Sequence, residues 1–421
     1  MRKMILFISW SLCVAVPLYF WSASMAAQGG EVAILDMAGL LGHIAYAFLF
    51  LQSFVIIAFP WTESLLGTQG SYEIHEKLGL MALAALLAHG FLLVSVYGEL
   101  PGDLFLWPAH IGFILLCINL ILSYGAKAGV VGYQLWAESH KSALLVFPLF
   151  FFHGIVIYRG DYLSPMALYY MALFGLFAVL AGCRLKRNSR LKKESHRILD
   201  VIKENHEVWT VVCEKKGFKY IPGQYAFVRT VHNGRISAPH PFSMTTQPRE
   251  NRIAFTVKWV GDFTSTIHHL KPGDSLIIDG PYGEFSFLKY ESSEMVFIAG
   301  GIGITPLFSM LRYAHAVKSR HPILLLWGNK RKDDIIFRQE LKQMTLDMER
   351  FKTVHILSRE KSKRGEKGHI DLERIRKYVE QPLRANYFIC GPAGLRKNII
   401  RILKEMGVEE KRIHVEKFSM S

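Results

Sequence analysis

The chain has 421 residues, which suits two or three domains, and a formal net charge of +15. Residues 1–183 carry a net charge of −3 and the remainder +18, which favours a domain beside an anionic membrane leaflet that binds an anionic cofactor, so we expect no nucleic-acid partner. The five cysteines show no C-x-x-C spacing, which argues against a disulfide framework and a zinc site.

Apolar stretches dominate the first half of the chain. Each is close to the ~20 residues that a helix needs to cross a bilayer. No arginine occurs between Arg2 and Arg159, as expected of helices that face a lipid bilayer. We therefore predict a six-helix transmembrane bundle within residues 1–190. Its spans are 4–22, 33–59, 74–97, 104–124, 136–158 and 164–183.

Charge in the loops predicts the orientation of the spans. The basic segment 184–193 follows the sixth stretch directly, and positive segments remain on the cytoplasmic side. Acidic residues stand in the loops of the other side. We expect a multi-pass protein of the cell (plasma or inner) membrane, with both termini and the C-terminal domains in the cytoplasm. The acidic loop residues are Glu31, Glu99, Asp103 and Asp161.

The first apolar stretch has a second interpretation. Arg2 and Lys3, the apolar run after them and the small residues at 23–27 resemble a signal peptide with its cleavage site. The run is long for a signal peptide, so we expect a retained helix. Cleavage would not invert the other five spans.

The pattern changes at about residue 194. Alternating runs such as 209–213 and 253–259 predict strands, and Pro-Gly and Gly-Pro turns separate them. We predict an antiparallel β-barrel domain over residues 194–290. Over residues 291–421, apolar runs alternate with helical stretches, which predicts a parallel α/β (Rossmann-like) domain. These runs are Met295–Ala299, Ile323–Trp327, Val354–Leu357 and Tyr387–Cys390.

Four histidines form two matched pairs in the apolar half. His75 and His89 are 14 residues apart in the third stretch, and His140 and His153 are 13 apart in the fifth. At about 1.5 Å per residue, both spacings are about 20 Å along helices that run in the same direction. His75 and His140 then share one level, and His89 and His153 share the other. Two imidazoles at one level can ligate a haem iron from both faces, so we predict two b-type haems.

Two further points bear on this haem prediction. Pro148 lies between His140 and His153, and we expect it to distort the helix so that both rings face the haems. The alternative is four buried polar residues bonded to neighbouring helices, which is costly for two matched pairs. His43 and His110 have no matched partner, and we expect them to be polar packing residues; the alternative is proton handling or contact with a haem propionate.

A flavin motif is predicted in the barrel domain. Residues 240–243 read His-Pro-Phe-Ser, and Tyr225 ends a Pro-Gly-Gln-Tyr turn before them. Phe242 can cover a flavin ring and Ser243 can hydrogen-bond its reactive nitrogen. Gly261 and Thr264 stand at the start of a predicted helix, 264–270, where a pyrophosphate can bind. We predict FAD at these residues, together with His240 and Pro241.

A nicotinamide motif is predicted in the last domain. Residues 298–306 read Ile-Ala-Gly-Gly-Ile-Gly-Ile-Thr-Pro, after a predicted strand and before a predicted helix at 307–318. Glycines there let backbone N–H groups approach a phosphate. A later predicted strand ends in Cys-Gly-Pro at 390–392. The predicted nucleotide-binding residues are Gly300, Gly301, Gly303, Thr305, Pro306, Cys390, Gly391 and Pro392.

The basic loop after residue 357 predicts the nucleotide preference. Ser358 and Arg359 can bind an adenosine 2′-phosphate, which favours NADPH over NADH. The alternative is a solvated basic loop.

Together these motifs resemble the NADPH oxidase / ferric reductase family, in which a six-helix dihaem domain is fused to a ferredoxin–NADP reductase-like module. The likeness covers nearly the whole chain. It implies His75, His89, His140 and His153 as haem ligands, and catalytic roles for Ser243 and Cys390. It also implies that Phe418 lies against the flavin until nicotinamide displaces it.

The family resemblance implies an NADPH-dependent flavohaem oxidoreductase that passes electrons through FAD and two haems to an acceptor outside. The acceptor is O₂, giving superoxide, or else a ferric chelate or a partner redox protein. Superoxide-forming members place an arginine in the second helix and a histidine four residues after the outer third-helix ligand. Here residues 33–59 contain no arginine, and the second position is Leu93.

Two other functional classes are weaker candidates. A membrane hydroxylase or desaturase needs clustered histidines such as His-x-x-x-His, which the membrane half lacks. A redox-sensing transporter or channel needs a water-lined path, and charged residues are scarce in the predicted helices.

Overall fold

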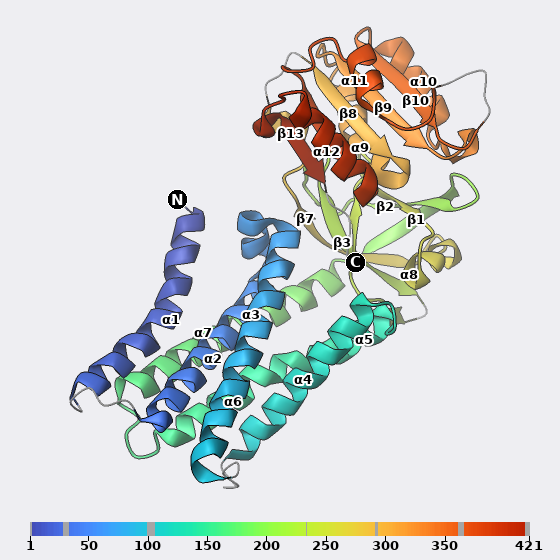
Figure 1. The fold of residues 1–421 in the computed structure, drawn as a ribbon. Helices are drawn as coiled ribbons and strands as arrows, with labels where there is room; N and C mark the ends of the chain where they lie inside the picture. Colours follow the sequence, from blue (N-terminus) through green and yellow to red (C-terminus); the bar gives the residue numbers. More distant parts are fainter. Residues whose placement is uncertain are drawn as a thin grey trace. The chain divides into compact units, whose positions relative to one another are not determined.

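The computed structural model describes residues 2–27, 33–98, 106–232, 234–290, 294–360 and 366–416. The chain forms two compact units, Met1–Arg190 and Leu191–Ser421. The first unit is helical and the second contains two sheets (Figure 1).

Long apolar helices form the first unit. Within the described residues, five helices are long and apolar enough to cross a membrane, and Trp10–Ala26 forms a shorter apolar helix. The predicted span 4–22 falls on that shorter helix, so six crossings stay a prediction. The elements are α1 (Arg2–Ala27), α2 (Ile34–Ile57), α3 (Phe59–Tyr97), α4 (Trp107–Lys127), α5 (Tyr133–Ser139), the 3₁₀ segment η2 (His140–Leu145), α6 (Val146–Ile157) and α7 (Pro165–Lys193).

Two helices differ from their predicted bounds. The third predicted span, 74–97, is the second part of α3, which begins at Phe59 and is broken at Gly67, where the backbone has φ 71°. The predicted distortion near Pro148 appears as η2, which ends just before α6. Pro148 is the third residue of α6 and has no N–H to donate to the Leu144 carbonyl, so the α-helical hydrogen-bond ladder is interrupted where η2 meets α6.

Aromatic packing holds the centre of the helical unit together. The Tyr46 ring stacks on the Phe147 and Tyr170 rings, with centroids 4.7 and 4.1 Å away. A Cβ at Gly154 would lie 2.0 Å from the Tyr170 ring, so α6 and α7 approach closely because this residue has no side chain.

The first sheet of the second unit is antiparallel. Its order is β4-β3-β7-β1-β2-β6, and β5 pairs with β3. A single antiparallel bridge between Met244 and Phe255 links the residue after β5 to β6, so one end of the path meets the strand that pairs with β3. Complete barrel closure stays a prediction. The strands are β1 (His196–Lys203), β2 (Val208–Glu214), β3 (Tyr225–His232), β4 (Arg235–Ile236), β5 (His240–Ser243), β6 (Arg252–Lys258) and β7 (Ser275–Tyr282).

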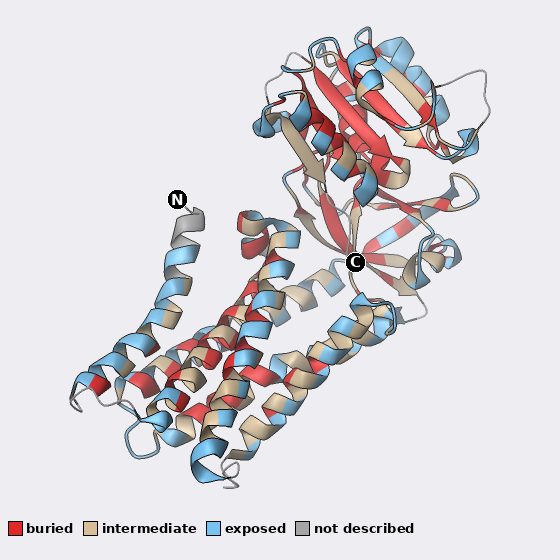
Figure 2. Cartoon of the chain, viewed as in Figure 1, coloured by how far each residue is buried: buried red, intermediate tan, exposed pale blue. Residues whose placement is uncertain are grey.

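The second sheet is parallel, with the order β11-β10-β9-β8-β12-β13. Its central strand β8 is fully buried, because helices pack on both faces: α9 and α10 on one, α11 and α12 on the other (Figure 2). The strands are β8 (Met295–Gly300), β9 (Ile323–Asn329), β10 (Phe351–Leu357), β11 (Glu366–Lys367), β12 (Asn386–Cys390) and β13 (Ile413–Glu416). The helices are α9 (Ile304–Ala316), α10 (Arg338–Asp347), α11 (Leu372–Tyr378) and α12 (Ala393–Glu405).

Two predicted helices of this unit have other bounds. The helix predicted at 307–318 starts earlier, at Ile304, because Pro306 is tolerated in a first turn. The helix predicted at 264–270 is instead the four-residue α8 (Asp262–Ser265) followed by the 3₁₀ turn η3 (Ile267–His269).

Candidate functional site

The four paired histidines of the helical unit meet as predicted from their spacing. The His75 and His140 ring centroids are 6.1 Å apart, and those of His89 and His153 are 6.5 Å apart. The planes within each pair cross at 76° and 73°. Each pair joins α3 to the segment formed by η2 and α6.

A hydrogen bond at Nδ1 fixes the tautomer of two of these histidines. Nδ1 of His75 lies 3.0 Å from the Gln52 carbonyl oxygen, and Nδ1 of His89 lies 2.7 Å from that of Ala38. A carbonyl oxygen only accepts, so Nδ1 carries the proton and Nε2 keeps a lone pair for a metal. Metal-bound histidine usually donates its other ring N–H to a carbonyl or carboxylate in this way.

The ring separations fit a metal held between the imidazoles. An iron–nitrogen bond of about 2 Å on each face, plus about 1 Å from nitrogen to ring centre, gives a centroid separation of roughly 6 Å. The two observed separations are close to this value. His43 bonds instead to the Tyr170 hydroxyl at 3.0 Å and the Tyr158 hydroxyl at 3.2 Å, which agrees with the polar packing role expected for it.

A cavity of about 840 Å³ lies in the second unit, and both predicted motifs contribute to it. The flavin motif supplies residues of β5 and α8, and the nicotinamide motif supplies residues at the ends of β8, β10 and β12. The predicted residues that line it are Pro241, Phe242, Ser243, Thr264, Gly300, Gly301, Gly303, Thr305, Ser358, Gly391 and Pro392.

Ser243 is the flavin-motif residue with the clearest chemistry. It pairs with Tyr225 of β3, is 4% exposed, and its Oγ has no hydrogen-bond partner among the described residues. A buried hydroxyl without a partner is costly, and it lines the cavity, so it can bind a polar ligand atom there. Phe242 beside it offers an aromatic face.

The glycine loop Gly300–Gly303 packs closely against the second nucleotide motif, Cys390–Pro392. A Cβ on Gly303 would lie 2.4 Å from the Cys390 carbonyl oxygen, and one on Gly300 would lie 2.8 Å from Pro392 Cδ. Gly301 has φ 51°. The loop therefore requires glycine for close packing at two positions and for conformation at the third, and it leads directly into α9.

Other predicted residues lie outside the cavity lining. Gly261 N–H donates to Thr264 Oγ1 at 3.0 Å, so it closes the turn before α8 and is not free for a phosphate. Cys390 is fully buried, and burial raises the pKa of its thiol, so its catalytic role stays a prediction. Phe418 lies outside the described residues. The others that do not line the cavity are Tyr225, His240, Pro306 and Arg359.

Sequence reasoning missed several cavity residues. Asn329, at the end of β9, is 6% exposed, and neither of its amide atoms is hydrogen-bonded within the described residues. Its neighbour Lys330 is basic, and both follow a buried parallel strand, which is a signal that could have identified them. The remaining missed polar residues come from all parts of the unit: Asn205, Glu207, Thr256, Lys258, Asp334, His369 and Arg396.

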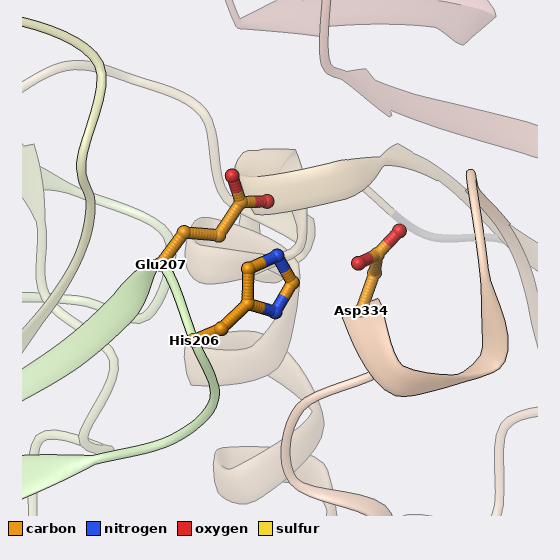
Figure 3. A group of neighbouring side chains, drawn as sticks. All are labelled: His206, Glu207 and Asp334. Atoms are coloured by element: carbon orange, nitrogen blue, oxygen red, sulfur yellow. The ribbon is translucent and has the colours of Figure 1, made fainter.

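A small group of possible metal ligands stands beside the cavity. His206, Glu207 and Asp334 place one ligand atom each within 4.8 Å of one another (Figure 3). Glu207 is already paired with Lys258, whose Nζ lies 2.6 Å from its Oε1. His206 is exposed. We assign no metal to this group.

His240 makes the stability of the folded chain depend on pH. Its ring stacks on Phe263 with centroids 3.8 Å apart, and burial lowers its pKa to about 4 from 6.5. As pH falls from 6.5 towards 4, the unfolded chain gains a proton that the folded chain does not, so stability is lost over that range. The loss should be on the order of 1–3 kcal/mol.

We expect His240→Gln to reduce this loss of stability in acid. Thermal unfolding of the full chain, compared at about pH 7 and about pH 4.5, measures it. His206→Gln, at an exposed position, is the matched control and should keep the wild-type pH dependence. An unchanged pH dependence in His240→Gln would contradict the assignment.

Two protein-family models match the second unit. Residues 193–286 match the FAD-binding domain family and residues 297–400 match the oxidoreductase NAD-binding domain family. One component of the Na(+)-translocating NADH-quinone reductase of Neisseria gonorrhoeae is 31% identical over 247 residues, 53% of this chain and 56% of that protein. The chain thus spans about half the length of this relative.

Two other proteins are similar to the chain. Sulfhydrogenase 2 subunit gamma of Pyrococcus furiosus is 31% identical over 216 residues, 48% of this chain and 73% of that protein. The flavohemoglobin of Malassezia yamatoensis, solved with FAD and heme, is similar in fold: the TM-score is 0.50 at 17% identity, over 92% of this chain and 96% of that one. Through residues 193–400, the chain belongs to the oxidoreductases that combine an FAD-binding domain with an oxidoreductase NAD-binding domain.

Proposed function

We propose that the protein is a membrane flavohaem oxidoreductase that moves electrons from cytosolic NADPH, through FAD and two b-type haems, to O₂ on the other side of the membrane, giving superoxide. The two histidine pairs carry this proposal. Their ring separations of 6.1 and 6.5 Å fit a bound iron, and they occur in one chain with an FAD- and NAD-binding module.

The histidines would hold the haems in a fixed order along the helices. His75 and His140 would ligate the cytosolic haem through Nε2, and His89 and His153 the outer one. When bound, FAD accepts the electron pair of the nicotinamide and the haems carry the electrons singly. The chain's residues supply the ligands, the tautomers and the apolar surroundings.

The cavity residues would bind the flavin and the nucleotide. Ser243 would donate to or accept from the flavin ring, and Phe242 would lie against its face. The loop Gly300–Gly303 would receive the nucleotide phosphates at the start of α9, where the backbone N–H groups and the helix dipole favour anions. Hydride transfer from the nucleotide to the flavin requires that water be excluded from the reacting atoms. The buried strand ends that line the cavity would help to exclude it.

The membrane setting follows from composition. Helices α2, α3, α4 and α7, and the segment Tyr133–Ile157, meet the length and hydropathy of membrane spans. The basic residues 184–193 would keep the second unit in the cytoplasm. NADPH is a cytosolic reductant in this arrangement.

A second acceptor class is favoured by two positions. The chain has no arginine in α2 and has Leu93 where superoxide-forming members of the resembled family place a histidine. A ferric chelate, or the redox centre of a partner protein, is therefore the second candidate. Superoxide production that superoxide dismutase abolishes would separate O₂ from these two.

The test of the proposed function is a reduced-minus-oxidised visible spectrum of the full chain purified in detergent. We expect two six-coordinate b-type haems and one FAD per chain. Protein that lacks a Soret band after expression with adequate iron and porphyrin would overturn the haem part, while bound FAD reduced by NADPH would still support the second unit.

Nucleotide preference has its own test. We expect Arg359→Ala to raise the KM for NADPH about tenfold and to leave the KM for NADH unchanged, because one charged hydrogen bond to the 2′-phosphate is lost. Ser358 beside it lines the cavity, and the backbone N–H of Arg359 donates to the Lys330 carbonyl at 2.9 Å. Arg401→Ala, on the exposed face of α12, is the control. Equal effects on both nucleotides would contradict the assignment.

A further inference from the structure

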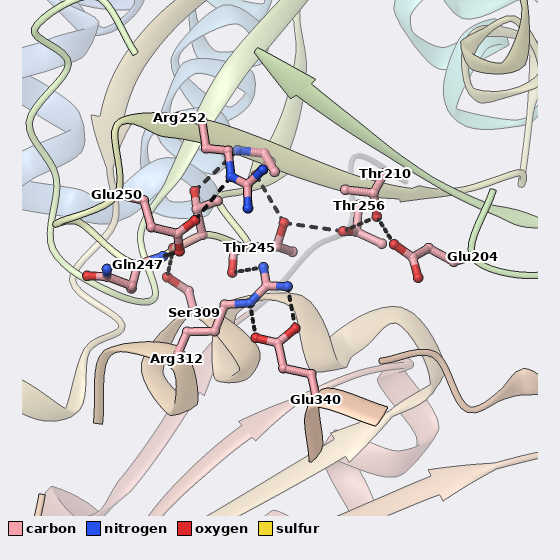
Figure 4. A network of polar contacts seen from close by, with 12 residues as sticks. Glu204, Thr210, Thr245, Gln247, Glu250, Arg252, Thr256, Ser309, Arg312 and Glu340 are labelled. Carbon is pink, nitrogen blue, oxygen red and sulfur yellow. Dashed lines mark hydrogen bonds and ion pairs between the residues drawn. The ribbon is translucent and has the colours of Figure 1, made fainter. Parts of the chain in front are cut away.

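A pair of side chains on α9 bonds to the segment that follows the flavin motif. Ser309 Oγ donates to the Thr246 carbonyl at 2.6 Å, and Arg312 Nη1 donates to the Thr245 carbonyl at 2.8 Å (Figure 4). The two donors are three residues apart, so they share one face of the helix. They therefore bond two consecutive carbonyl groups of the antiparallel sheet domain.

The positions of these bonds connect the two cofactor motifs. Thr245 lies two residues after Ser243, and α9 begins at Ile304, directly after the glycine loop. If the bond between Arg312 and the Thr245 carbonyl changed, α9 and the glycine loop before it would move relative to Ser243. The distance between a nucleotide bound at the loop and a flavin bound at Ser243 would then change.

Arg312 is itself held from several directions. Its Nε and Nη2 donate to the two carboxylate oxygens of Glu340, both at 2.7 Å, and its side chain is 17% exposed. The guanidinium lies over the rings of Phe308 and Phe337, 4.6 and 5.2 Å from their centroids. The guanidinium is thus already fixed by two hydrogen bonds to Glu340 and by two aromatic rings. It therefore loses little further conformational entropy when it bonds the Thr245 carbonyl.

Phe337, one of the two rings beneath the Arg312 guanidinium, has an unusual backbone conformation. It has φ 57°, a left-handed conformation that is uncommon for a bulky residue. In this conformation it is the N-cap residue just before α10, and its ring stacks on the Phe308 ring with centroids 4.2 Å apart. The strain is compatible with a native fold only where surrounding contacts compensate for it.

The flavin side of the contact is also rigid. The Thr245 N–H donates to the Ala254 carbonyl at 2.9 Å, and Thr246 Oγ1 shares a hydrogen bond with the Tyr220 hydroxyl at 2.8 Å. Thr245 and Thr246 are both buried. The carbonyls that Arg312 and Ser309 reach are thus held from the sheet side as well.

We infer that Arg312, supported by Glu340 and Ser309, is a positioning residue that sets the distance and angle between NADPH and the flavin for hydride transfer. This inference rests on the proposed function of the second unit. It predicts that loss of the guanidinium slows the reduction of FAD by NADPH much more than it weakens nucleotide binding, because a misplacement of about 1 Å costs about 100-fold in rate.

The experiment uses the full chain with bound FAD under anaerobic conditions. Stopped-flow absorbance gives the limiting rate of flavin reduction by NADPH, and titration with NADP⁺ gives its Kd. The variants are Arg312→Met, Arg312→Lys, Ser309→Ala and Glu340→Gln. Arg401→Met removes an exposed arginine that pairs with Glu405 at 3.3 Å and is the matched control.

We expect Arg312→Met to lower the limiting rate tenfold or more, with the Kd for NADP⁺ within threefold of wild type and the FAD content unchanged. Arg312→Lys should recover part of the rate, and Arg401→Met should equal wild type. A wild-type rate in Arg312→Met, or a fall in rate and nucleotide affinity by equal factors, would overturn the inference.

Two further outcomes are distinguished. If Arg312→Met does not retain FAD, the milder variants decide, since Ser309→Ala leaves the Arg312 bond in place and Glu340→Gln leaves both donors in place; wild-type rates in both would overturn the inference. If wild-type protein binds FAD but is not reduced by NADPH or NADH, the proposed function of the second unit fails, and the inference fails with it.

Discussion

Replacing His89 with leucine is expected to lower the haem content from two to one per chain and to reduce electron delivery to an outer acceptor by about 100-fold or more, because one step of the route is removed. Reduction of FAD by NADPH should stay within twofold of wild type, since the second unit is unchanged. Haem is measured from the pyridine haemochrome spectrum, and flavin reduction by stopped-flow absorbance.

The expected effect of this variant rests on the proposed ligand role of His89. Its Nδ1 donates to the Ala38 carbonyl at 2.7 Å, which leaves the lone pair on Nε2, and its ring centroid lies 6.5 Å from that of His153. Leucine fills a similar volume but offers no lone pair. The loss should therefore be specific to the ligand and should not unfold α3.

Two companion variants make the haem experiment decisive. His140→Leu should remove the other haem, and His110→Leu should keep both, because His110 bonds to the carbonyl of Leu106, the residue just before its own helix, at 3.1 Å. Two haems retained in His89→Leu would contradict the ligand assignment. A fall of flavin reduction in parallel with haem content would indicate general damage and would also count against it.

Replacing Gly303 with alanine is expected to slow the reduction of FAD by NADPH by about 100-fold. The new Cβ would lie 2.4 Å from the Cys390 carbonyl oxygen and 2.7 Å from Gly391 Cα, both backbone atoms that cannot rotate away. The glycine loop would have to move from the strand end that holds it. The nucleotide phosphates would then meet displaced N–H groups.

The Gly303→Ala variant tests the steric contact of the new Cβ and not a change in backbone conformation. Its φ is −61°, which alanine adopts freely, so no conformational strain is added. Gly394→Ala, on α12, is the control, since its Cβ would meet no atom within 4 Å. It should stabilise the protein by about 0.5–1 kcal/mol, because alanine is a better helix former than glycine.

The measurements are the limiting rate of flavin reduction, the Kd for NADP⁺ and the melting temperature. We expect both the rate and the affinity to fall in Gly303→Ala, in contrast to Arg312→Met, where the rate should fall alone. Wild-type affinity and rate in Gly303→Ala would show that the nucleotide does not use this loop.

Features that depend on residues close together in the sequence could be predicted from the sequence alone. The apolar stretches, the change to alternating strands near residue 194 and the glycine loop before α9 follow from periodicity and local turn chemistry. The histidine spacing also specified which rings share a level, because rise per residue is fixed in a helix. The errors were mostly at boundaries, as at Ile304 and Phe59, where one more turn costs little free energy.

Contacts between distant segments were decided only by the tertiary structure. The sequence indicated a flavin motif and a nicotinamide motif, but not that Arg312 of α9 bonds the segment after the flavin motif, nor that the Cys390 carbonyl oxygen leaves no room for a side chain at Gly303. The position of Asn329 at the end of a buried strand could have been expected from the sequence, but only the strand order β10-β9-β8 brings that end to the cavity. The amino-acid order determines local conformation through short-range sterics and hydrogen bonds, whereas side chains far apart in the chain meet only when strand order and core packing bring them together.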